Sequence, residues 1–167
     1  LTGSGTVDFN NYQLSLGGFY SSTNPWMWNQ TFQGAADLVL NGHVVLNNDW
    51  KFEGKSVVNG RGNIIELSNG GQIVVSGSDG ELYLNDVYIK GVASSGAGKI
   101  IFDTDGGKLY LNDVIIELDG AMTTSVGNFI VNGTTTFLLK GHDWTFGPDY
   151  LQSTQGVLTV NDRLWLD

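Results

Sequence analysis

The stretch Leu82–Ile89 (LYLNDVYI) returns further along the chain as Leu109–Ile116 (LYLNDVII). Two looser copies are Leu38–Leu46 (LVLNGHVVL) upstream and Leu158–Leu166 (LTVNDRLWL) downstream. Copies separated by a few tens of residues are typical of solenoids, in which each unit buries its apolar face only against its neighbours. The repeat therefore predicts that these four stretches occupy equivalent positions in stacked coils.

Within the repeated stretch, the residue pattern predicts a strand that turns a corner. Apolar and other side chains alternate up to Leu84, and the alternation resumes at Val87, which is typical of half-buried strands. The intervening Asn and Asp tolerate left-handed backbone angles and bond their own backbone, so they suit a bend. We expect such corners at the following residues: Asn85, Asp86, Asn112, Asp113, Asn161 and Asp162.

Two all-β architectures fit this pattern. Asn-Gly and Asp-Gly pairs such as Asn132-Gly133 are typical of hairpins and would suit an antiparallel β-sandwich. A repeat with like residues at like positions instead favours a single-stranded parallel β-helix, a β-solenoid with irregular coils. In that fold Tyr83 would stack on Tyr110, and Asn85 on Asn112. We favour the β-solenoid.

The repeated LYLNDV stretches, the Gly-Gly turns and the Asn residues at corners resemble the parallel β-helix, or pectin-lyase-like, superfamily. The resemblance covers about residues 36–167. That superfamily includes polysaccharide lyases and hydrolases, phage tailspikes, adhesins and surface repeat proteins. The resemblance therefore implies a fold and leaves the activity open.

The first part of the chain differs from the repeat. We expect residues 1–35 to form an N-terminal strand followed by an aromatic-rich cap or subunit-contact segment, and residues 36–167 to form the solenoid repeats. Trp26 and Trp28 lie in this early segment beside other aromatics. Terminal repeats of solenoids are usually atypical, which favours a cap or a subunit contact over a sugar-binding platform.

Composition narrows the classes of partner. The net charge is −9, whereas nucleic-acid binding requires a basic surface, so we expect no nucleic-acid partner. The chain has no cysteine, which excludes disulfides, thiol catalysis and zinc–thiolate sites. No apolar run approaches the length of a membrane span, so we expect no membrane insertion. An acidic, cysteine-free repeat protein suggests an extracellular or cell-surface location.

Several polar residues are candidates for catalysis or metal binding. Asp103–Gly107 (DTDGG) resembles the start of a calcium loop but lacks its remainder, and it is interpreted as a turn. The aspartates Asp86, Asp113 and Asp162 recur at one repeat position, which is typical of structural corners. His43 and His142 lie in no metal-binding motif. We predict no catalytic residue, no metal site, no cofactor and no enzymatic activity.

The two ends of the predicted rod suggest a partner. The sequence finishes on an apolar strand, and an uncovered solenoid end exposes unpaired strand edges and core side chains. We expect the chain to stack head to tail on copies of itself as a filament, or to form part of a long surface protein. The expected interface residues are Val7, Phe9, Leu14, Trp26 and Trp28 at one end, and Leu158, Val160, Leu164 and Trp165 at the other.

The alternative function is a carbohydrate-binding or polysaccharide-degrading β-helix. In that case Trp26, Trp28, Trp50 or Trp144 would stack on sugar rings, and the repeat aspartates would line a groove. Carbohydrate is therefore the alternative partner to a second copy of the chain.

Overall fold

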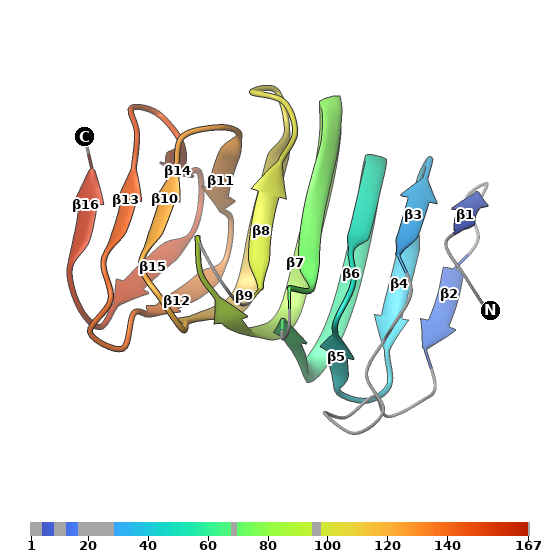
Figure 1. The fold of residues 1–167 in the computed structure, drawn as a ribbon, viewed down its shortest axis with the longest axis horizontal. Helices are drawn as coiled ribbons and strands as arrows, with labels where there is room; N and C mark the ends of the chain where they lie inside the picture. The colour runs from blue at the N-terminus through green and yellow to red at the C-terminus, as the bar shows by residue number, and fades with distance from the viewer. Residues whose placement is uncertain (1–4, 9–12, 17–28, 68–69, 95–97, 167) are drawn as a thin grey trace.

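The chain forms a β-solenoid of about 6 turns in a computed structural model that describes residues 5–8, 13–16, 29–67, 70–94 and 98–166. Strand pairing within these residues is parallel throughout, and successive coils stack side by side from the N-terminal to the C-terminal end (Figure 1). No helix among them is long and apolar enough to cross a membrane. The antiparallel sandwich is therefore excluded, and the predicted parallel β-helix is confirmed.

The described strands lie on three faces of the rod. Face 1 contains β1 (Gly5–Asp8), β3 (Gln30–Gln33), the first part of β6 (Trp50–Leu67), the first part of β7 (Gln72–Val92), β8 (Lys99–Phe102), β10 (Met122–Thr124), β13 (Trp144–Phe146) and β16 (Leu164–Leu166). Face 2 contains β2 (Gln13–Leu16), β4 (Asp37–Leu40), the middle of β6 and β7, the first part of β9 (Lys108–Leu118), β11 (Asn128–Val131) and β14 (Leu151–Ser153). Face 3 contains β5 (Val44–Leu46), the last parts of β6, β7 and β9, β12 (Thr134–Leu138) and β15 (Val157–Val160).

The chain turns from face 2 to face 3 at the predicted Asn-Asp corners. Asp86 and Asp113 have φ angles of 49° and 54°, in the left-handed region that Asp tolerates better than most residues. The neighbouring asparagines form a ladder along the rod: the Nδ2 of Asn112 donates to Asn85 at 3.4 Å, and Asn85 donates to Asn59 at 3.0 Å. The corner is thus both a bend in each coil and a polar link between coils.

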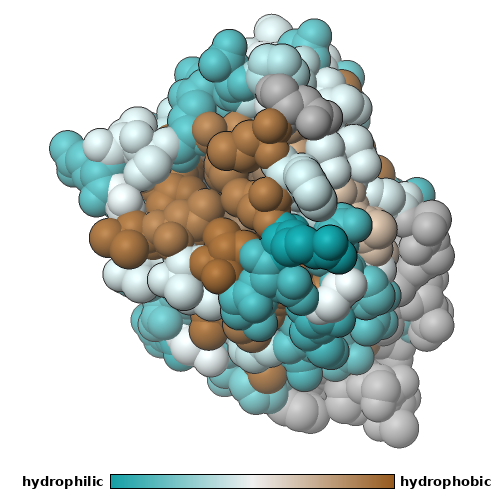
Figure 2. All heavy atoms as spheres, turned by 90° about the vertical axis from the view of Figure 1, so that its left-hand side faces the viewer, coloured by the Kyte–Doolittle hydropathy of each residue, from teal (hydrophilic) through white to brown (hydrophobic). Residues whose placement is uncertain are grey.

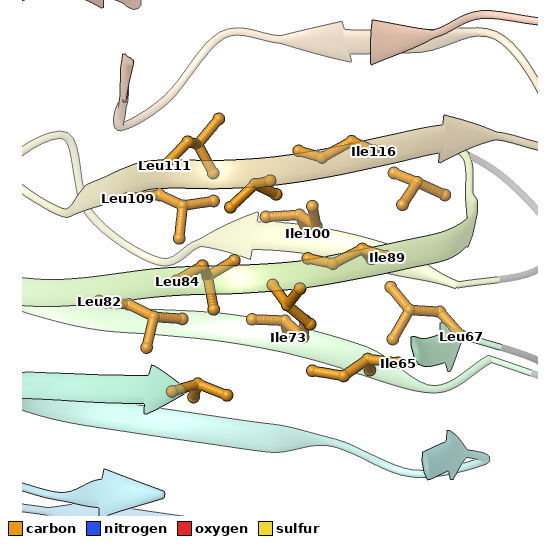
Figure 3. Packing of buried hydrophobic residues seen from close by; sticks show 14 of the residues in the cluster. Ile65, Leu67, Ile73, Leu82, Leu84, Ile89, Ile100, Leu109, Leu111 and Ile116 are labelled. Atoms are coloured by element: carbon orange, nitrogen blue, oxygen red, sulfur yellow. The ribbon is translucent and has the colours of Figure 1, made fainter. Parts of the chain in front are cut away.

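The core is a set of columns, each made of residues at the same register position in successive coils. Leu82 lies over Leu109, and Leu84 over Leu111, all fully buried (Figure 3). On the outer surface of face 2, Tyr83 stacks on Tyr110 with ring centroids 4.2 Å apart and planes 3° apart. The predicted Tyr-on-Tyr and Asn-on-Asn stacking is confirmed, since the two LYLNDV copies pair residue by residue.

The two looser copies do not occupy the predicted positions. Leu158 pairs with Thr135 on face 3, so the 158–166 copy runs from face 3 to face 1 instead of from face 2 to face 3. Leu38 pairs with Val58, which in turn pairs with Leu84, so the upstream copy is shifted by two residues from its predicted register. The downstream alignment is wrong because the same apolar-Asn-Asp phrase also occurs at another corner of a coil. The upstream alignment is wrong because that copy passes the same corner in a different register.

Candidate assembly surface at the C-terminal coil

The last coil presents three strands whose outer edges are unpaired among the described residues. β14 pairs with β11, β15 with β12 and β16 with β13, and none of the three has a described partner on its other side. Unpaired N–H and C=O groups along a strand edge are a template for adding a further strand. One end of the rod therefore offers main-chain hydrogen bonding on all three faces.

Core-facing side chains of this coil are partly uncovered. Leu166 occupies the same column as Phe146, yet Leu166 is 68% exposed whereas Phe146 is fully buried. Leu158, Val160 and Leu164 also continue interior columns and are only partly buried against the core. The last coil therefore lacks the neighbour that completes the burial of each preceding coil.

Apolar side chains gather on this end in one patch. Figure 2 looks onto it and shows hydrophobic residues bordered by hydrophilic ones. The most exposed members are Leu166, Val157, which is 66% exposed, and Trp165, which is 49% exposed. A contiguous apolar patch with a polar border is typical of an interaction site.

The N-terminal end carries strands that continue the same faces. β1 pairs with β3 on face 1, and β2 pairs with β4 on face 2, both in parallel. On face 2 the register columns run from the first described strand to the last: the column of Gln13 passes through Tyr83 and Tyr110 and finishes at Gln152. A second copy placed beyond the last coil would therefore meet β14 and β16 with strands of the same direction.

The predicted interface residues fall into three groups. Leu158, Val160, Leu164 and Trp165 lie together on the last coil, as described above. Val7 lies in β1, opposite Phe32, and Leu14 lies in β2, opposite Leu38, so both belong to the first strands of the rod. Phe9, Trp26 and Trp28 lie outside the described residues.

The repeat aspartates serve two different corners. Asp86 and Asp113 occupy the corner between faces 2 and 3, and the Asp113 carboxylate accepts a hydrogen bond from the Thr134 N–H at 3.3 Å. Asp162, with Asn161, instead follows β15 at the corner between faces 3 and 1, where its carboxylate accepts from the Gly141 N–H at 2.9 Å. The prediction of one shared position is wrong for Asp162.

The tryptophans proposed as sugar platforms are core residues where the structure describes them. Trp50 and Trp144 are both fully buried, and the Trp144 indole N–H donates to the Thr124 hydroxyl at 3.0 Å. An indole can stack on a sugar only where its face is accessible, so neither ring can bind carbohydrate. This part of the carbohydrate hypothesis is wrong, because the Asp-Trp-x-Phe phrase places its aromatics inward.

Of the remaining polar candidates, Asp103 and His43 link neighbouring coils, and His142 lies in a turn within one coil. The Asp103 carboxylate accepts hydrogen bonds from the Ser76 hydroxyl and from the Gly77 N–H at 2.9 Å. The His43 Nδ1 accepts a hydrogen bond from the Ile64 N–H at 2.9 Å, and the His142 N–H donates to the Leu139 carbonyl. No group of three or more His, Asp or Glu side chains suited to a metal ion occurs in the described part of the chain.

Glu117, on face 3, also links coils, and its hydrogen bonds to the other coils perturb its pKa. Glu117 in β9 accepts hydrogen bonds from the Tyr88 hydroxyl and from Lys140 Nζ, so it joins three coils. Burial alone would raise the pKa of Glu117, but these two donors outweigh it and hold the pKa below its ordinary value. Burial and the bond to Glu117 raise the pKa of Tyr88 to about 12.

Comparison with known protein families, with curated proteins and with solved structures found no match to this chain. The function is therefore inferred from the surface of the rod itself.

Two features of this surface were missed in the sequence. Val157 and Leu166 were not predicted as interface residues, although each is more exposed than Trp165. Their position in strands that flank the predicted residues was the available signal. The sequence also did not reveal a break in face 1, although the extra residues around Val92–Gly98 indicated a longer coil there.

Proposed function

We propose that this protein is a non-enzymatic structural β-solenoid of the extracellular or cell-surface space, whose copies stack head to tail into a filament. The observation that carries the proposal is the last coil, where the outer edges of three parallel strands have no partner in the described part of the chain and interior columns open onto solvent. A further β-coil is the one structure that pairs all three edges and covers these columns together. In a long surface protein, that coil would come from the same polypeptide.

The apolar patch alone is a weak driving force for such stacking. Full burial of a large apolar side chain contributes about 1.5–3 kcal/mol. Val157, Trp165 and Leu166 are half to two-thirds exposed, but Val157 and Trp165 lie in the outward columns of Thr134 and Thr145. Stacking would bury these two only in part, so the three together would supply at most roughly 3–6 kcal/mol. Association costs at least about 4 kcal/mol in lost translational and rotational freedom. Main-chain hydrogen bonds along β14, β15 and β16 must therefore supply part of the free energy of association. This requirement restricts the partner to strands of matching direction.

The charge supports an exposed, self-repelling side surface. At a net charge of −9, the flanks of two rods repel each other, so contact is favoured at the apolar ends over the sides. This asymmetry favours linear growth, because a heterologous contact that does not close produces an open filament.

The experiment is electron microscopy combined with sedimentation velocity on the purified wild-type chain and on Trp165→Asp. We expect thin filaments or a concentration-dependent series of oligomers for the wild type and a monomer for Trp165→Asp, because a charged carboxylate would interrupt the apolar patch of the last coil. Ile115→Asp is the matched control: Ile115 is 36% exposed on face 3 in the middle of the rod, so this variant should assemble normally.

Two results would contradict the proposal. A wild-type chain that stays monomeric at high concentration would exclude assembly of copies and favour a module of a longer surface protein. The resemblance to the pectin-lyase-like superfamily supports a competing role in carbohydrate degradation, so the chain should also be incubated with acidic and neutral polysaccharides. Release of reducing ends would contradict the non-enzymatic role.

A further inference from the structure

Face 1 is interrupted in the middle of the rod, and the interruption is independent of the end surface. β8 pairs with β7, and β10 pairs with β13, but no main-chain hydrogen bond joins β8 to β10 among the residues that the structure describes. Faces 2 and 3 continue at this level, since β9 pairs with both β11 and β12. Two coils thus separate on one face while remaining paired on the others; in Figure 1, β8 stands apart from β10, whereas β10 and β13 lie side by side.

The cause is an irregular coil between β7 and β8. The register of β7 against β9 shifts between Ile89 and Val92, where Gly91 has a φ of 79°. This bulge leads into Ser94, whose N–H donates to the Ala121 carbonyl. The chain then reaches β8 only after additional residues, so β8 arrives out of step with β10.

In a parallel sheet, the N–H groups of successive residues point alternately to the two neighbouring strands. This alternation identifies which main-chain groups face the gap. The Lys99 and Asp103 N–H groups donate to β7 and the residue that precedes it, so Ile100 and Phe102 direct theirs toward β10. On the opposite wall, Met122 and Thr124 bond the β13 side. The alternate residues of that wall therefore face β8.

Ser94 lies at one end of this gap and bonds the edge of β10. The Thr123 N–H, which would meet β8 in a continuous ladder, instead donates to Ser94 Oγ at 2.8 Å. Ser94 therefore bonds two successive positions of the β10 edge, as a residue of an inserted strand would. Beyond Ser94, the Ile100 and Phe102 N–H groups and the Ser125 N–H have no hydrogen-bond partner among the described residues.

A cavity of about 210 Å³ occupies the gap. Its walls are β8, Ala93 and Ser94, and the 122–126 segment. By liquid volume it would hold about seven waters, and it is smaller than the ~300–1,000 Å³ of sites for drug-sized ligands. Phe102 is 8% exposed and Ile100 6%, whereas Val75, in the column of Phe102, is fully buried. Ile100 and Phe102 thus stay in the core with only their edges at the gap, which has room for a narrow occupant.

We propose that this gap between β8 and β10 binds an extended peptide segment of a partner protein, which inserts as an additional strand of face 1. Both walls offer main-chain donors and acceptors, and an extended main chain complements both at once. Residues at the level of Ile100 and Met122 would point inward and must be small and apolar. Residues at the level of Ile101 and Thr123 would point outward and are best polar.

The test is a titration of the ¹⁵N-labelled full chain with capped pentapeptides of the form acetyl-Thr-Xaa-Thr-Xaa-Thr-amide, where Xaa is Ala or Val. We expect saturable shifts of the Ile100, Phe102 and Ser125 amide signals, and slower hydrogen exchange at Ile100 and Phe102. The same peptides N-methylated at each Xaa should bind at least tenfold more weakly, because they lose main-chain donors.

Two variants separate main-chain pairing from side-chain recognition. Ser125→Pro removes a donor that faces the gap and should weaken peptide binding severalfold with an unchanged thermal midpoint. Thr123→Val removes an exposed hydroxyl, keeps the main chain, and should bind normally. The proposal is overturned if no signal of these amides shifts at millimolar peptide, or if the N-methylated peptides bind equally well.

Discussion

The middle coils and the last coil have the same kind of strands but very different burial. Leu84 and Leu111, in the middle, each have a coil on both sides and are fully buried. Leu166, in an interior column of the last coil, has a coil on one side and is 68% exposed. Burial in this fold is therefore a property of neighbouring coils, and a given apolar pattern is core or interface according to what stacks on it.

This difference separates two kinds of tryptophan, and it predicts the largest effect. Trp144→Ala should lower the free energy of unfolding by about 3–5 kcal/mol, because it empties a fully buried site. Trp165→Ala, at the exposed end, should change the stability of the monomer by less than about 1 kcal/mol. Urea unfolding of both variants at low protein concentration measures the difference. Equal losses would show that the last coil is as well packed as the middle.

The second contrast concerns two glycines with positive φ. Gly91 in a middle coil has φ 79°, and a Cβ there would lie 2.4 Å from the Leu67 carbonyl oxygen of the adjacent coil. Gly141, near the last coil, has φ 81° and nothing within 4 Å of such a Cβ. Gly91→Ala should therefore cost about 2–3 kcal/mol, and Gly141→Ala about 1 kcal/mol, the strain alone. Thermal unfolding of the two variants compares them; similar midpoints would contradict the close approach.

The asparagine ladder gives a smaller effect. Asn85 lies inside the ladder and bonds both Asn59 and Asn112, whereas Asn112 bonds Asn85 at the ladder's edge. Asn85→Ala should cost about 1–2 kcal/mol and Asn112→Ala about half as much, at roughly 1 kcal/mol per hydrogen bond. Chemical denaturation of both single variants tests this order, and the reverse order would show that the ladder is not the stabilising element.

The smallest effect is a dependence on pH. Because the folded protein holds the pKa of Glu117 below its ordinary value of 4.5, Glu117 stabilises the fold above that pH, and this stability is lost as pH falls through the folded pKa. Unfolding measured from pH 7 down to pH 3 should show a shallower decline for Glu117→Gln than for the wild type. Asp143→Asn, which removes an exposed ion pair with Arg163 at the end of the rod, should leave the profile unchanged.

The fold could be predicted from the sequence because two copies of the repeat are nearly identical. Residues 82–89 and 109–116 lie on adjacent coils in the register that their alignment gives, so Tyr83 stacks on Tyr110. The downstream copy failed because it preserves the corner residues but not the face, and the upstream copy failed because it keeps the faces but not the register. Asn161-Asp162 and Asn85-Asp86 are the same phrase at different corners, and local sequence does not distinguish one corner from another.

The candidate site was predicted in part. The apolar alternation of residues 158–165 identified strands at the end of the rod, while the exposure of Val157 and Leu166 depends on what lies beyond each strand. The alternative hypothesis used Trp50 and Trp144 as sugar platforms because a Trp between polar residues is compatible with either side of a strand. The gap beside β8 depends on the register between coils, which a single sequence does not encode locally.

The central claim is that a second copy stacks on the last coil with the three faces continuous, and cysteine pairing tests it directly. The chain has no cysteine, and Gln13 and Gln152 occupy the two ends of one column on face 2. Neighbouring strands lie about 4.8 Å apart, which is within disulfide range. Gln13→Cys combined with Gln152→Cys should give a ladder of disulfide-linked oligomers on a non-reducing gel.

Two control variants make the result specific. Gln13→Cys combined with Thr159→Cys, which lies on face 3, should give no ladder, and Trp165→Asp should abolish the ladder of the face 2 pair. A ladder from the face 2 pair alone is the result that head-to-tail stacking predicts. Monomers only, or dimers from Gln152→Cys by itself, would contradict it.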